Sequence, residues 1–416
     1  MPRKGVVVVS PTPDTASRLD VISTICQRLL DEAAGLEDAA VDLLPFPRQV
    51  IRADLALAVS RLEAFAGIIP RLAGRRPLGR VALALPGNAI LSNPLATIAA
   101  SHLTGNKTLV RLPRRRRAWA EVLSGLVGDV AEFIDHDGAG FLSYAMHQPE
   151  IDALMAFGDD AWAAGYETLA RVTGTKLIFE GPGKDPFLVL CPALVDEAAR
   201  AAVEAGTFNA GQACTSPERF YVVSAAYDDF VERVTDLVRE LNAGDPKDAE
   251  TQIGPLAPVV AQRIEEQMQD AVGKGAVVLN TGLRKPMNVN GEERVLVPPI
   301  VVAGADHRMT VMREETFGPV IAIQRVGSIP EALELAESSP YGLSATAFGR
   351  VAGVAERLER SHGQVFIEET WLSRRRKRPL APYGGRRRSG WVWEWQDEQF
   401  VRRDGPRHNF LEFSRS

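Results

Sequence analysis

Apolar positions along the chain fall into two patterns, which predict helices and strands. Near the N-terminus, Leu19, Ile22, Ile25 and Leu29 recur every three or four residues, the spacing of one face of an α-helix. The valines at 6–9 that precede them have the composition of a β-strand. The chain is therefore expected to begin with a strand that is followed by long amphipathic helices.

The pattern between residues 80 and 111 indicates a parallel sheet. Short strand-like segments at 81–85 and 107–111 flank a segment with helical spacing at 93–102, and glycine turns separate the three. The order strand, helix, strand is the βαβ unit of a parallel sheet, in which ligands gather at the carboxyl ends of the strands. The predicted fold class is therefore α/β.

The same alternation continues along the chain. Strands are expected near Phe141 and at 153–157, 176–179, 187–190 and 220–223. Helices are expected at 118–133, 160–172, 196–205, 227–241 and 259–271. A last strand is expected at 409–413, where it could pair with another chain.

Length and composition narrow the class of protein. With 416 residues, 45% of them hydrophobic and 24% charged, the chain is long enough for two domains. It has no apolar run that could span a bilayer and no secretory pattern, so no membrane association is expected. Three cysteines favour a reducing cytoplasm over a disulfide framework. Six histidines without metal-ligand spacing predict no metal site.

Three basic runs interrupt a protein whose net charge is −5. They lie at 114–117, 374–378 and 386–388. Such runs usually form solvated faces. Because these three flank the motifs described next, they also favour an anionic small ligand, while no nucleic-acid partner is expected.

One cysteine stands in a segment suited to nucleophilic chemistry. Cys214 follows Asn209 and Gly211 at the turn between a predicted helix and a predicted strand. A thiol acts as a nucleophile in its thiolate form, which backbone N–H groups or a nearby base must favour. Gly211 lets the backbone approach closely, so the N–H of Cys214 could face a developing oxyanion. A free cysteine is also often a small buried hydrophobic residue, and the cysteine alone leaves both interpretations open.

The segment Phe208-Asn209-Ala210-Gly211-Gln212-Ala213-Cys214 resembles the nucleophile signature of the aldehyde dehydrogenase superfamily. Further stretches from about residue 80 to 393 resemble other signatures of that family in the same order. The resemblance implies an aldehyde dehydrogenase-like α/β fold with two Rossmann-like domains. It implies N-terminal helices with a dinucleotide-binding domain at 1–190 and a catalytic thiol domain at 191–370. A C-terminal segment at 371–416 would return to the cofactor domain and could supply an oligomerisation strand for a homodimer.

The resemblance also implies the roles of individual residues. Cys214 would be the nucleophile, Asn88 the side-chain donor to the oxyanion, and Glu180 the general base at the family's spacing from the cysteine. Glu315 would hold the hydroxyls of the nicotinamide ribose, and Phe317 would pack beside the nicotinamide ring. The implied cofactor is NADP or NAD.

Two features of the sequence depart from the family pattern on the cofactor side. Arg111 takes the place of the usual lysine at the adenosine ribose, and Arg114 replaces an acidic residue usual in NAD-using members. Guanidinium groups bind a 2′-phosphate that a carboxylate would repel, so NADP is expected to be preferred. Gly158 stands at the pyrophosphate turn, but Asp159 and Asp160 follow it, and carboxylates are poor neighbours for phosphate.

The resemblance implies oxidation of a small-molecule aldehyde through a thioester on Cys214, which water activated by Glu180 would hydrolyse. An alternative is NADPH-dependent reduction of an acyl-CoA or acyl-carrier-protein thioester. The segment Cys214-Thr215-Ser216-Pro217 is similar to acyl-CoA reductases, and the run 374–378 could bind CoA phosphates or an acidic carrier protein. The presence of Glu180 opposes this alternative. A third possibility is a non-catalytic homologue that binds a partner or a nucleotide.

Overall fold

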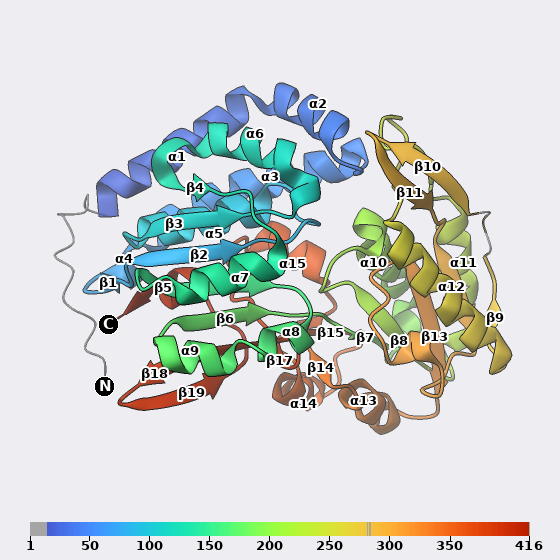
Figure 1. Ribbon diagram of the computed structural model, residues 1–416. Coiled ribbons are helices and arrows are strands. Elements are labelled where there is room, and N and C mark those ends of the chain that lie inside the picture. Colours follow the sequence, from blue (N-terminus) through green and yellow to red (C-terminus); the bar gives the residue numbers. More distant parts are fainter. Residues whose placement is uncertain (1–14, 281, 283, 416) are drawn as a thin grey trace.

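The computed structural model describes residues 15–280, 282 and 284–415. The strand expected at 6–9 lies outside the described residues. Within them, two seven-stranded sheets organise the chain, and they lie side by side in Figure 1. Each sheet is covered by helices on both faces, so the expected α/β fold class is confirmed.

The first sheet carries the strands of the N-terminal half together with a C-terminal hairpin. Its order is β19-β18-β6-β5-β2-β3-β4. The parallel strands are β2 (Arg80–Ala84), β3 (Lys107–Arg111), β4 (Glu132–Phe133), β5 (Ile151–Phe157) and β6 (Lys176–Glu180). The hairpin of β18 (Gly390–Gln396) and β19 (Gln399–Arg403) adds antiparallel to β6.

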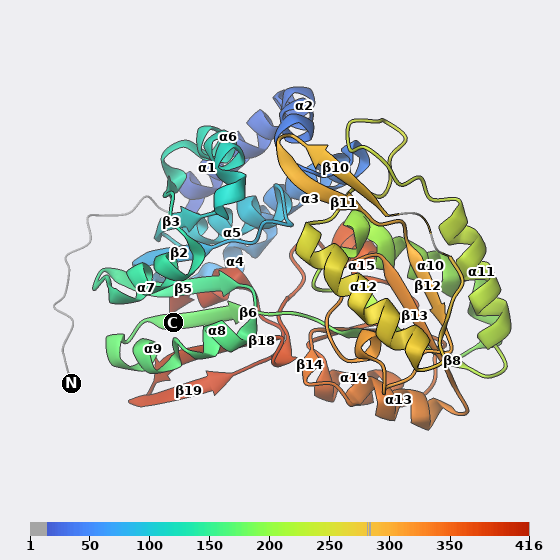
Figure 2. The same ribbon diagram turned by 45° about the vertical axis from the view of Figure 1, so that its right-hand side comes forward.

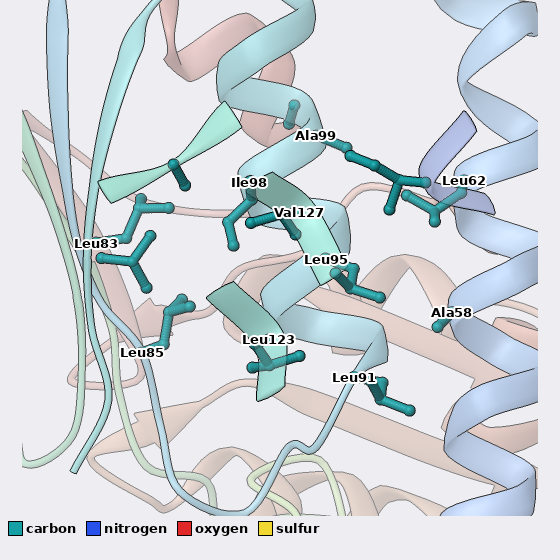
Figure 3. Packing of buried hydrophobic residues seen from close by; sticks show 14 of the residues in the cluster. Ala58, Leu62, Leu83, Leu85, Leu91, Leu95, Ile98, Ala99, Leu123 and Val127 are labelled. Atoms are coloured by element: carbon teal, nitrogen blue, oxygen red, sulfur yellow. The ribbon is translucent and has the colours of Figure 1, made fainter. Parts of the chain in front are cut away.

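Both faces of the first sheet are buried, as β2 shows. Successive side chains of this strand point to opposite faces. Val81 and Leu83 belong to one hydrophobic cluster, and Ala82 and Ala84 belong to another. The helices that contribute to the first cluster include α1 (Thr15–Asp31), α2 (Ala33–Leu43), α3 (Arg48–Ala64), α4 (Ile69–Leu72), α5 (Ser92–Leu103) and α6 (Arg117–Val127). Figure 3 shows Leu83 against Ile98 of α5, with residues of α3 and α6 around them. The helices of the opposite face are α7 (Gly138–His147), α8 (Asp160–Ala164) and α9 (Glu167–Thr173).

The second sheet has the order β16-β15-β7-β8-β13-β12-β9. Its parallel strands are β7 (Asp185–Val189), β8 (Pro217–Val223), β12 (Ile300–Ala303), β13 (Val320–Val326), β15 (Ser344–Phe348) and β16 (Gln364–Ile367), and β9 (Val277–Val278) pairs antiparallel at one edge. The helices of this half are α10 (Val195–Thr207), α11 (Tyr227–Arg239), α12 (Pro258–Gly273), α13 (Ile329–Glu337) and α14 (Val354–Ser361). The helices and strands expected around Cys214 are thus confirmed as α10 and β8.

Short elements complete the fold. The two-stranded pairs are β1 (Arg76–Pro77) with β20 (Ser414–Arg415), β10 (Lys285–Val289) with β11 (Glu292–Leu296), and β14 (Tyr341–Gly342) with β17 (Arg386–Arg387). Helix α15 (Trp371–Lys377) lies between the two sheets in Figure 1 and overlaps α10 in the turned view of Figure 2. The last helix is α16 (Asn409–Glu412).

Four expectations about single elements were wrong. Phe141 lies in helix α7, where Phe141, Leu142, Ala145 and Met146 are buried at helical spacing. The helix expected at 118–133 ends at Val127, and Gly128 then adopts the left-handed conformation (φ 59°). The helix expected at 160–172 is divided into α8 and α9.

The fourth correction concerns the C-terminus. Residues 409–412 form helix α16, which buries Phe410, and not a strand for another chain. The strand that follows, β20, pairs with β1 of the same chain.

The expected domain limits at 190 and 370 stay a prediction. Because β6 belongs to the first sheet and β7 to the second, we propose that the first unit ends between Glu180 and Asp185 and resumes with β18. No helix in the described part of the chain is long and apolar enough to cross a membrane.

Candidate active site

A cleft of about 540 Å³ lies at the carboxyl ends of the first sheet's parallel strands and is closed by loops of the second half. This is where an α/β sheet binds its ligands, and the volume is in the range of small-molecule sites. Seven of the eight residues singled out from the sequence line this cleft: Asn88, Arg111, Gly158, Glu180, Cys214, Glu315 and Phe317. Arg114 is exposed and does not line the cleft, whereas the neighbouring Arg115 does.

The loop that carries Cys214 has an unusual backbone. Between α10 and β8, Asn209, Ala210 and Gly211 adopt left-handed conformations with φ of 54°, 53° and 71°. For a residue other than glycine this costs about 1–2 kcal/mol. The tight turn brings Gly211 against the backbone of Gly318, where a Cβ on Gly211 would lie 2.3 Å from the carbonyl oxygen. The loop that carries Cys214, called the nucleophile loop below, and the loop that carries Phe317 are therefore in close backbone contact.

The thiol of Cys214 is half-buried and hydrogen-bonded. Its Sγ lies 2.8 Å from the hydroxyl oxygen of Tyr383. Burial raises the pKa of Cys214 to about 11, while the hydrogen bond from Tyr383 and the charge of Arg375 act in the opposite direction. At neutral pH the resting thiol is therefore mostly protonated, and it needs a proton acceptor to become a nucleophile.

Asn88 lies beside the backbone that precedes the thiol. Its Nδ2 donates to the carbonyl oxygen of Gln212 at 3.0 Å. The side chain of Asn209 donates in turn to the carbonyl oxygen of Asn88 at 3.3 Å. These bonds tie the end of β2 to the nucleophile loop and hold the Asn88 amide close to Cys214.

Glu180 is a buried carboxyl with one occupied and one free oxygen. Its side chain is 2% exposed, and Oε1 accepts a hydrogen bond from Arg407 Nη2 at 2.7 Å. Oε2 has no hydrogen-bond partner among the residues that the structure describes. Burial raises the pKa of Glu180 to about 7, although Arg407 opposes the rise. A carboxyl that titrates near neutral pH is suited to general-base chemistry.

Glu315 and Phe317 are placed by a buried ion pair beneath them. Glu218 accepts hydrogen bonds from the backbone N–H groups of Thr316 and Phe317 at 2.8 and 2.7 Å, and from Lys184 Nζ at 2.6 Å. Glu315 Oε1 accepts from the N–H of Gly183 at 3.0 Å. Burial, followed by the charge of Glu218, raises the pKa of Glu315 to about 8.

Arginines form another wall of the cleft. Arg111 donates from Nε to the carbonyl oxygen of His136 at 3.0 Å. Arg116 packs its guanidinium over Phe46, and Arg294 of β11 joins it in the cleft lining. Burial lowers the pKa of Arg116 to about 9 and that of Arg294 to about 10. Glu292 forms ion pairs with both Arg116 and Arg294. The charge of this wall that could hold a phosphate group therefore comes mainly from Arg111 and Arg115.

The turn after β5 carries less free negative charge than its sequence indicates. Asp160 forms a two-pronged ion pair with Arg388 at 2.5 and 2.7 Å. Asp159 accepts a hydrogen bond from the N–H of Ala161 and lines the cleft. Gly158 has a φ of 149°, and its N–H donates to the carbonyl oxygen of Glu180.

Several residues of the site were not singled out from the sequence. They are Arg61, Arg115, Arg375, Tyr383 and Arg407. Arg375 lies in the basic run 374–378, but this pattern did not indicate a position beside Cys214. No sequence pattern indicated the contact between Tyr383 and Cys214. Arg407 had no local signal. The described residues contain no group of three or more His, Cys, Asp or Glu side chains that could hold a metal ion.

Two mostly parallel, helix-covered sheets, with a cysteine-bearing loop that lines the cleft, define an α/β protein with two Rossmann-like halves. The chain belongs to the aldehyde dehydrogenase family, whose sequence model matches residues 22–401. The family membership expected from the sequence is thus confirmed.

The chain resembles proteins named succinate-semialdehyde dehydrogenase (NADP(+)). It is 34% identical over 252 residues to one from Mycobacterium avium, covering 59% of this chain and 51% of the relative. It is 30% identical over 327 residues to one from Mycobacterium tuberculosis, covering 76% of this chain and 69% of the relative. The chain spans about half the length of the first of these relatives.

A solved structure of succinate-semialdehyde dehydrogenase from Burkholderia pseudomallei superposes with a TM-score of 0.86 at 23% identity. The match covers 97% of this chain and 84% of that one. At this identity the likeness shows the fold alone.

Proposed function

We propose that the chain is an NAD(P)-dependent aldehyde dehydrogenase, with Cys214 as nucleophile, Glu180 as general base and Asn88 as an oxyanion donor. The observation that carries the proposal is the burial and the raised pKa of the Glu180 carboxyl. A buried carboxyl with a pKa of about 7 and one unoccupied oxygen lines the same cleft as the thiol. Such a group can take a proton at neutral pH, which hydrolysis of a thioester requires.

In this proposal Cys214 releases its proton to solvent, and its Sγ bonds to the carbonyl carbon of the aldehyde as the carbonyl π bond breaks. The N–H of Cys214 and Nδ2 of Asn88 stabilise the resulting oxyanion. A nicotinamide cofactor, when bound, supplies the acceptor for the hydride of the aldehyde carbon. Glu180 then takes a proton from the water that attacks the thioester, the carboxylate product leaves, and the thiol is restored.

The residues of the cleft fit a phosphorylated dinucleotide. Its arginine wall suits a 2′-phosphate, and this supports NADP as the preferred cofactor, with Arg111 and Arg115 as the nearest candidates. Glu315 and Phe317 stand near the thiol, where the nicotinamide ribose and ring would lie. The part of Arg114 and Gly158 in cofactor binding stays a prediction.

The thioester-reductase alternative has lost part of its support. Three of the five basic residues in the run 374–378 form ion pairs within the chain: Arg374 and Lys377 with Glu369, and Arg376 with Glu204. They are therefore less available for CoA or an acidic carrier protein. A carrier protein, a homodimer and a cytoplasmic location stay predictions.

The test is a single-turnover absorbance trace of the reduced nicotinamide, with a panel of aldehydes and NADP. We expect the band to grow with the wild type and with Cys191→Ala, a half-buried thiol outside the cleft, but not with Cys214→Ala. Consumption of NADPH with acyl-CoA, and no response to aldehydes, would establish the reductase. If neither assay changes the absorbance of the nicotinamide while the protein still binds the nucleotide, the non-catalytic homologue would be favoured.

A further inference from the structure

Tyr383 places its hydroxyl at the reactive sulfur from a segment whose backbone is fixed. The phenol oxygen lies 2.8 Å from Sγ of Cys214, and both residues line the cleft. The backbone N–H of Tyr383 donates to the carbonyl oxygen of Arg407 at 2.8 Å, and the N–H of Arg407 donates to the carbonyl oxygen of Tyr383 at 2.7 Å. The guanidinium of Arg375 lies over the ring, 5.7 Å from the ring centre. The fold therefore sets the position of the hydroxyl.

The thiol is the only hydrogen-bond partner of this hydroxyl within the described residues. A phenol that is held in a protein usually keeps a partner for its O–H, because an unpaired donor away from water is unfavourable. The hydroxyl of Tyr383 therefore needs an acceptor at each stage of the reaction, and this acceptor has to lie close to the sulfur.

The two donors already proposed for the oxyanion differ in how free they are. The backbone N–H of Cys214 makes no hydrogen bond in the part of the chain that the structure describes, so it is available. Nδ2 of Asn88, in contrast, donates to the carbonyl oxygen of Gln212 at 3.0 Å, which occupies one of its two N–H groups. An alkoxide oxygen accepts several hydrogen bonds, so these two donors leave room for another.

The hydrogen bond from Tyr383 to the sulfur loses its acceptor in the first chemical step. When Sγ of Cys214 bonds to the carbonyl carbon, the π bond of the carbonyl breaks and its electron pair moves to the oxygen. The sulfur is then a thioether, which is a weak acceptor, whereas the oxyanion is a strong one. The oxyanion stands on the carbon that is attached to Sγ. It therefore lies within reach of a hydroxyl that already contacts the sulfur.

We propose that the hydroxyl of Tyr383 moves its hydrogen bond from Sγ to the oxyanion as the carbon–sulfur bond forms, and so acts as a third oxyanion donor. The hydroxyl keeps its proton in this step. Burial, followed by the charge of Cys214, raises the pKa of Tyr383 well above its ordinary value, which favours the intact O–H. The inference rests on the proposed function and adds a catalytic residue to it.

The test compares two reactions of the same thiolate in the absence of nucleotide. Acylation by p-nitrophenyl acetate passes through an oxyanion, whereas alkylation by iodoacetamide occurs at a saturated carbon and forms none. A change in the pKa of Cys214 alters both rates through the thiolate fraction, so the ratio of the acylation rate to the alkylation rate isolates the oxyanion. The first turnover of nitrophenol release, corrected with Cys214→Ala, and mass spectrometry of the Cys214 peptide measure the two rates.

Tyr383→Phe keeps the ring and removes the hydroxyl. We expect it to lower this ratio at least about tenfold, by the same factor at each pH, because one oxyanion donor is lost. Asn88→Ala should also lower the ratio, since it removes another donor. Tyr144→Phe, on the exposed side of α7, is the matched control and should leave the ratio unchanged. If Tyr383→Phe slows both reactions by the same factor, Tyr383 acts on the thiol alone and the donor role is overturned.

Aldehyde oxidation separates this inference from the proposed activity. In that assay kcat/KM of Tyr383→Phe should fall by a larger factor than its alkylation rate. If Tyr383→Phe lowers the ratio but no aldehyde is oxidised with NADP or NAD, the proposed activity is wrong and the donor role stands. If aldehydes are oxidised and the ratio is unchanged, the donor role is wrong and the activity stands. If the wild type releases nitrophenol no faster than Cys214→Ala, Cys214 is not the nucleophile and both are wrong.

Discussion

The hydroxyl of Tyr383 lies 2.8 Å from Sγ of Cys214, and the backbone of Tyr383 pairs with that of Arg407, whose side chain holds Glu180. The two groups proposed to react are thus both held by one antiparallel bridge in the C-terminal segment. Tyr383 influences the protonation of the thiol, and Arg407 influences that of the carboxyl. The C-terminal segment therefore contacts both of these groups as well as completing the first sheet.

Replacement of Tyr383 by Phe should make the thiol less reactive. The hydrogen bond from Tyr383 lowers the pKa of Cys214, so its loss moves this pKa further above about 11. At a fixed pH below the pKa, the thiolate fraction and the rate of alkylation by iodoacetamide should fall about tenfold. Mass spectrometry of the labelled peptides separates Cys214 from Cys26 and Cys191.

The control for this change is Tyr144→Phe, on the exposed side of α7. It should alkylate at the wild-type rate. A Tyr383→Phe protein whose pH profile of alkylation matches the wild type would mean that the hydroxyl does not influence the protonation of the thiol.

Replacement of Glu180 by Gln should stop turnover after one cycle. Without the carboxylate no group activates water, so the thioester would accumulate on Cys214. We expect a burst of reduced nicotinamide equal to the enzyme concentration, followed by a steady rate about 10²–10⁴-fold below that of the wild type. Rapid-mixing absorbance and the intact mass of the acylated protein measure the two phases. If the variant shows neither a burst nor acylation, Glu180 would instead act in the step before the thioester forms, as the group that deprotonates Cys214.

The same carboxyl should make folding stability depend on pH. The folded protein binds this proton more tightly than the unfolded chain, because burial raises the pKa of Glu180 to about 7. Its contribution is therefore fully present below the ordinary carboxyl range and is lost as pH rises toward and through 7.

Glu180→Gln removes this dependence. The free energy of unfolding of the variant, relative to the wild type, should increase between pH 5 and 8 by an amount on the order of 2–3 kcal/mol. Urea unfolding at several pH values measures it, with the exposed Glu356→Gln as the control. A difference that stays constant with pH would show that Glu180 titrates normally in the fold.

The sequence was sufficient to locate the groups that follow strand ends and family-like turns. Asn88 and Glu180 lie in one cleft because β2 and β6 are parallel strands whose carboxyl ends meet at the same edge of the first sheet. Cys214 reaches this cleft from the other sheet, on the loop between α10 and β8. The sequence did not show which side chains of the basic run 114–117 face the cleft. Arg114 and Arg115 stand in a 3-10 turn, in which consecutive side chains point about 120° apart. Arg115 therefore lines the cleft, whereas Arg114, one position earlier, does not.

Contacts between distant segments had no signal in the sequence. Glu180 and Arg407 meet because β18 adds to β6, which no local pattern near either residue indicates. The assignment near Phe141 failed for another reason. A short apolar run fits a strand or a buried helix equally well, and packing on the sheet decided for the helix.

Replacement of Lys184 by Met should destabilise the protein and disturb the cofactor side of the cleft. The ammonium group is fully buried and pairs with Glu218, which in turn holds the backbone of Thr316 and Phe317. Removal of one partner leaves an uncompensated buried charge and costs about 3–5 kcal/mol. Urea unfolding measures the loss, and Lys184→Met/Glu218→Gln should recover part of it.

The exposed pair of Arg325 and Asp228 provides the comparison. Arg325→Met should change the free energy of unfolding by less than about 1 kcal/mol. An equally small effect of Lys184→Met would mean that the fold does not depend on the pairing of Glu218 with this cation.

Two glycines near the nucleophile differ in what a methyl group would meet, although they stand only five positions apart in the sequence. Gly206 lies in helix α10, and a Cβ there would have its nearest neighbour at 3.6 Å, an ordinary contact. Gly206→Ala should therefore leave activity unchanged and add about 0.5–1 kcal/mol of stability, because alanine favours the helix. Gly211 has a φ of 71°, and its Cβ would lie 2.3 Å from the carbonyl oxygen of Gly318.

Gly211→Ala must push the nucleophile loop away from the loop of Phe317. The left-handed conformation alone costs about 1–2 kcal/mol, and the displaced backbone carries Cys214 away from Tyr383 and Asn88. We expect kcat to fall by at least about tenfold, since displacements of this size lower the rate strongly. Initial rates, alkylation of Cys214 and urea unfolding of both variants test this. Equal activity in Gly206→Ala and Gly211→Ala would show that the contact between the two loops does not position the thiol.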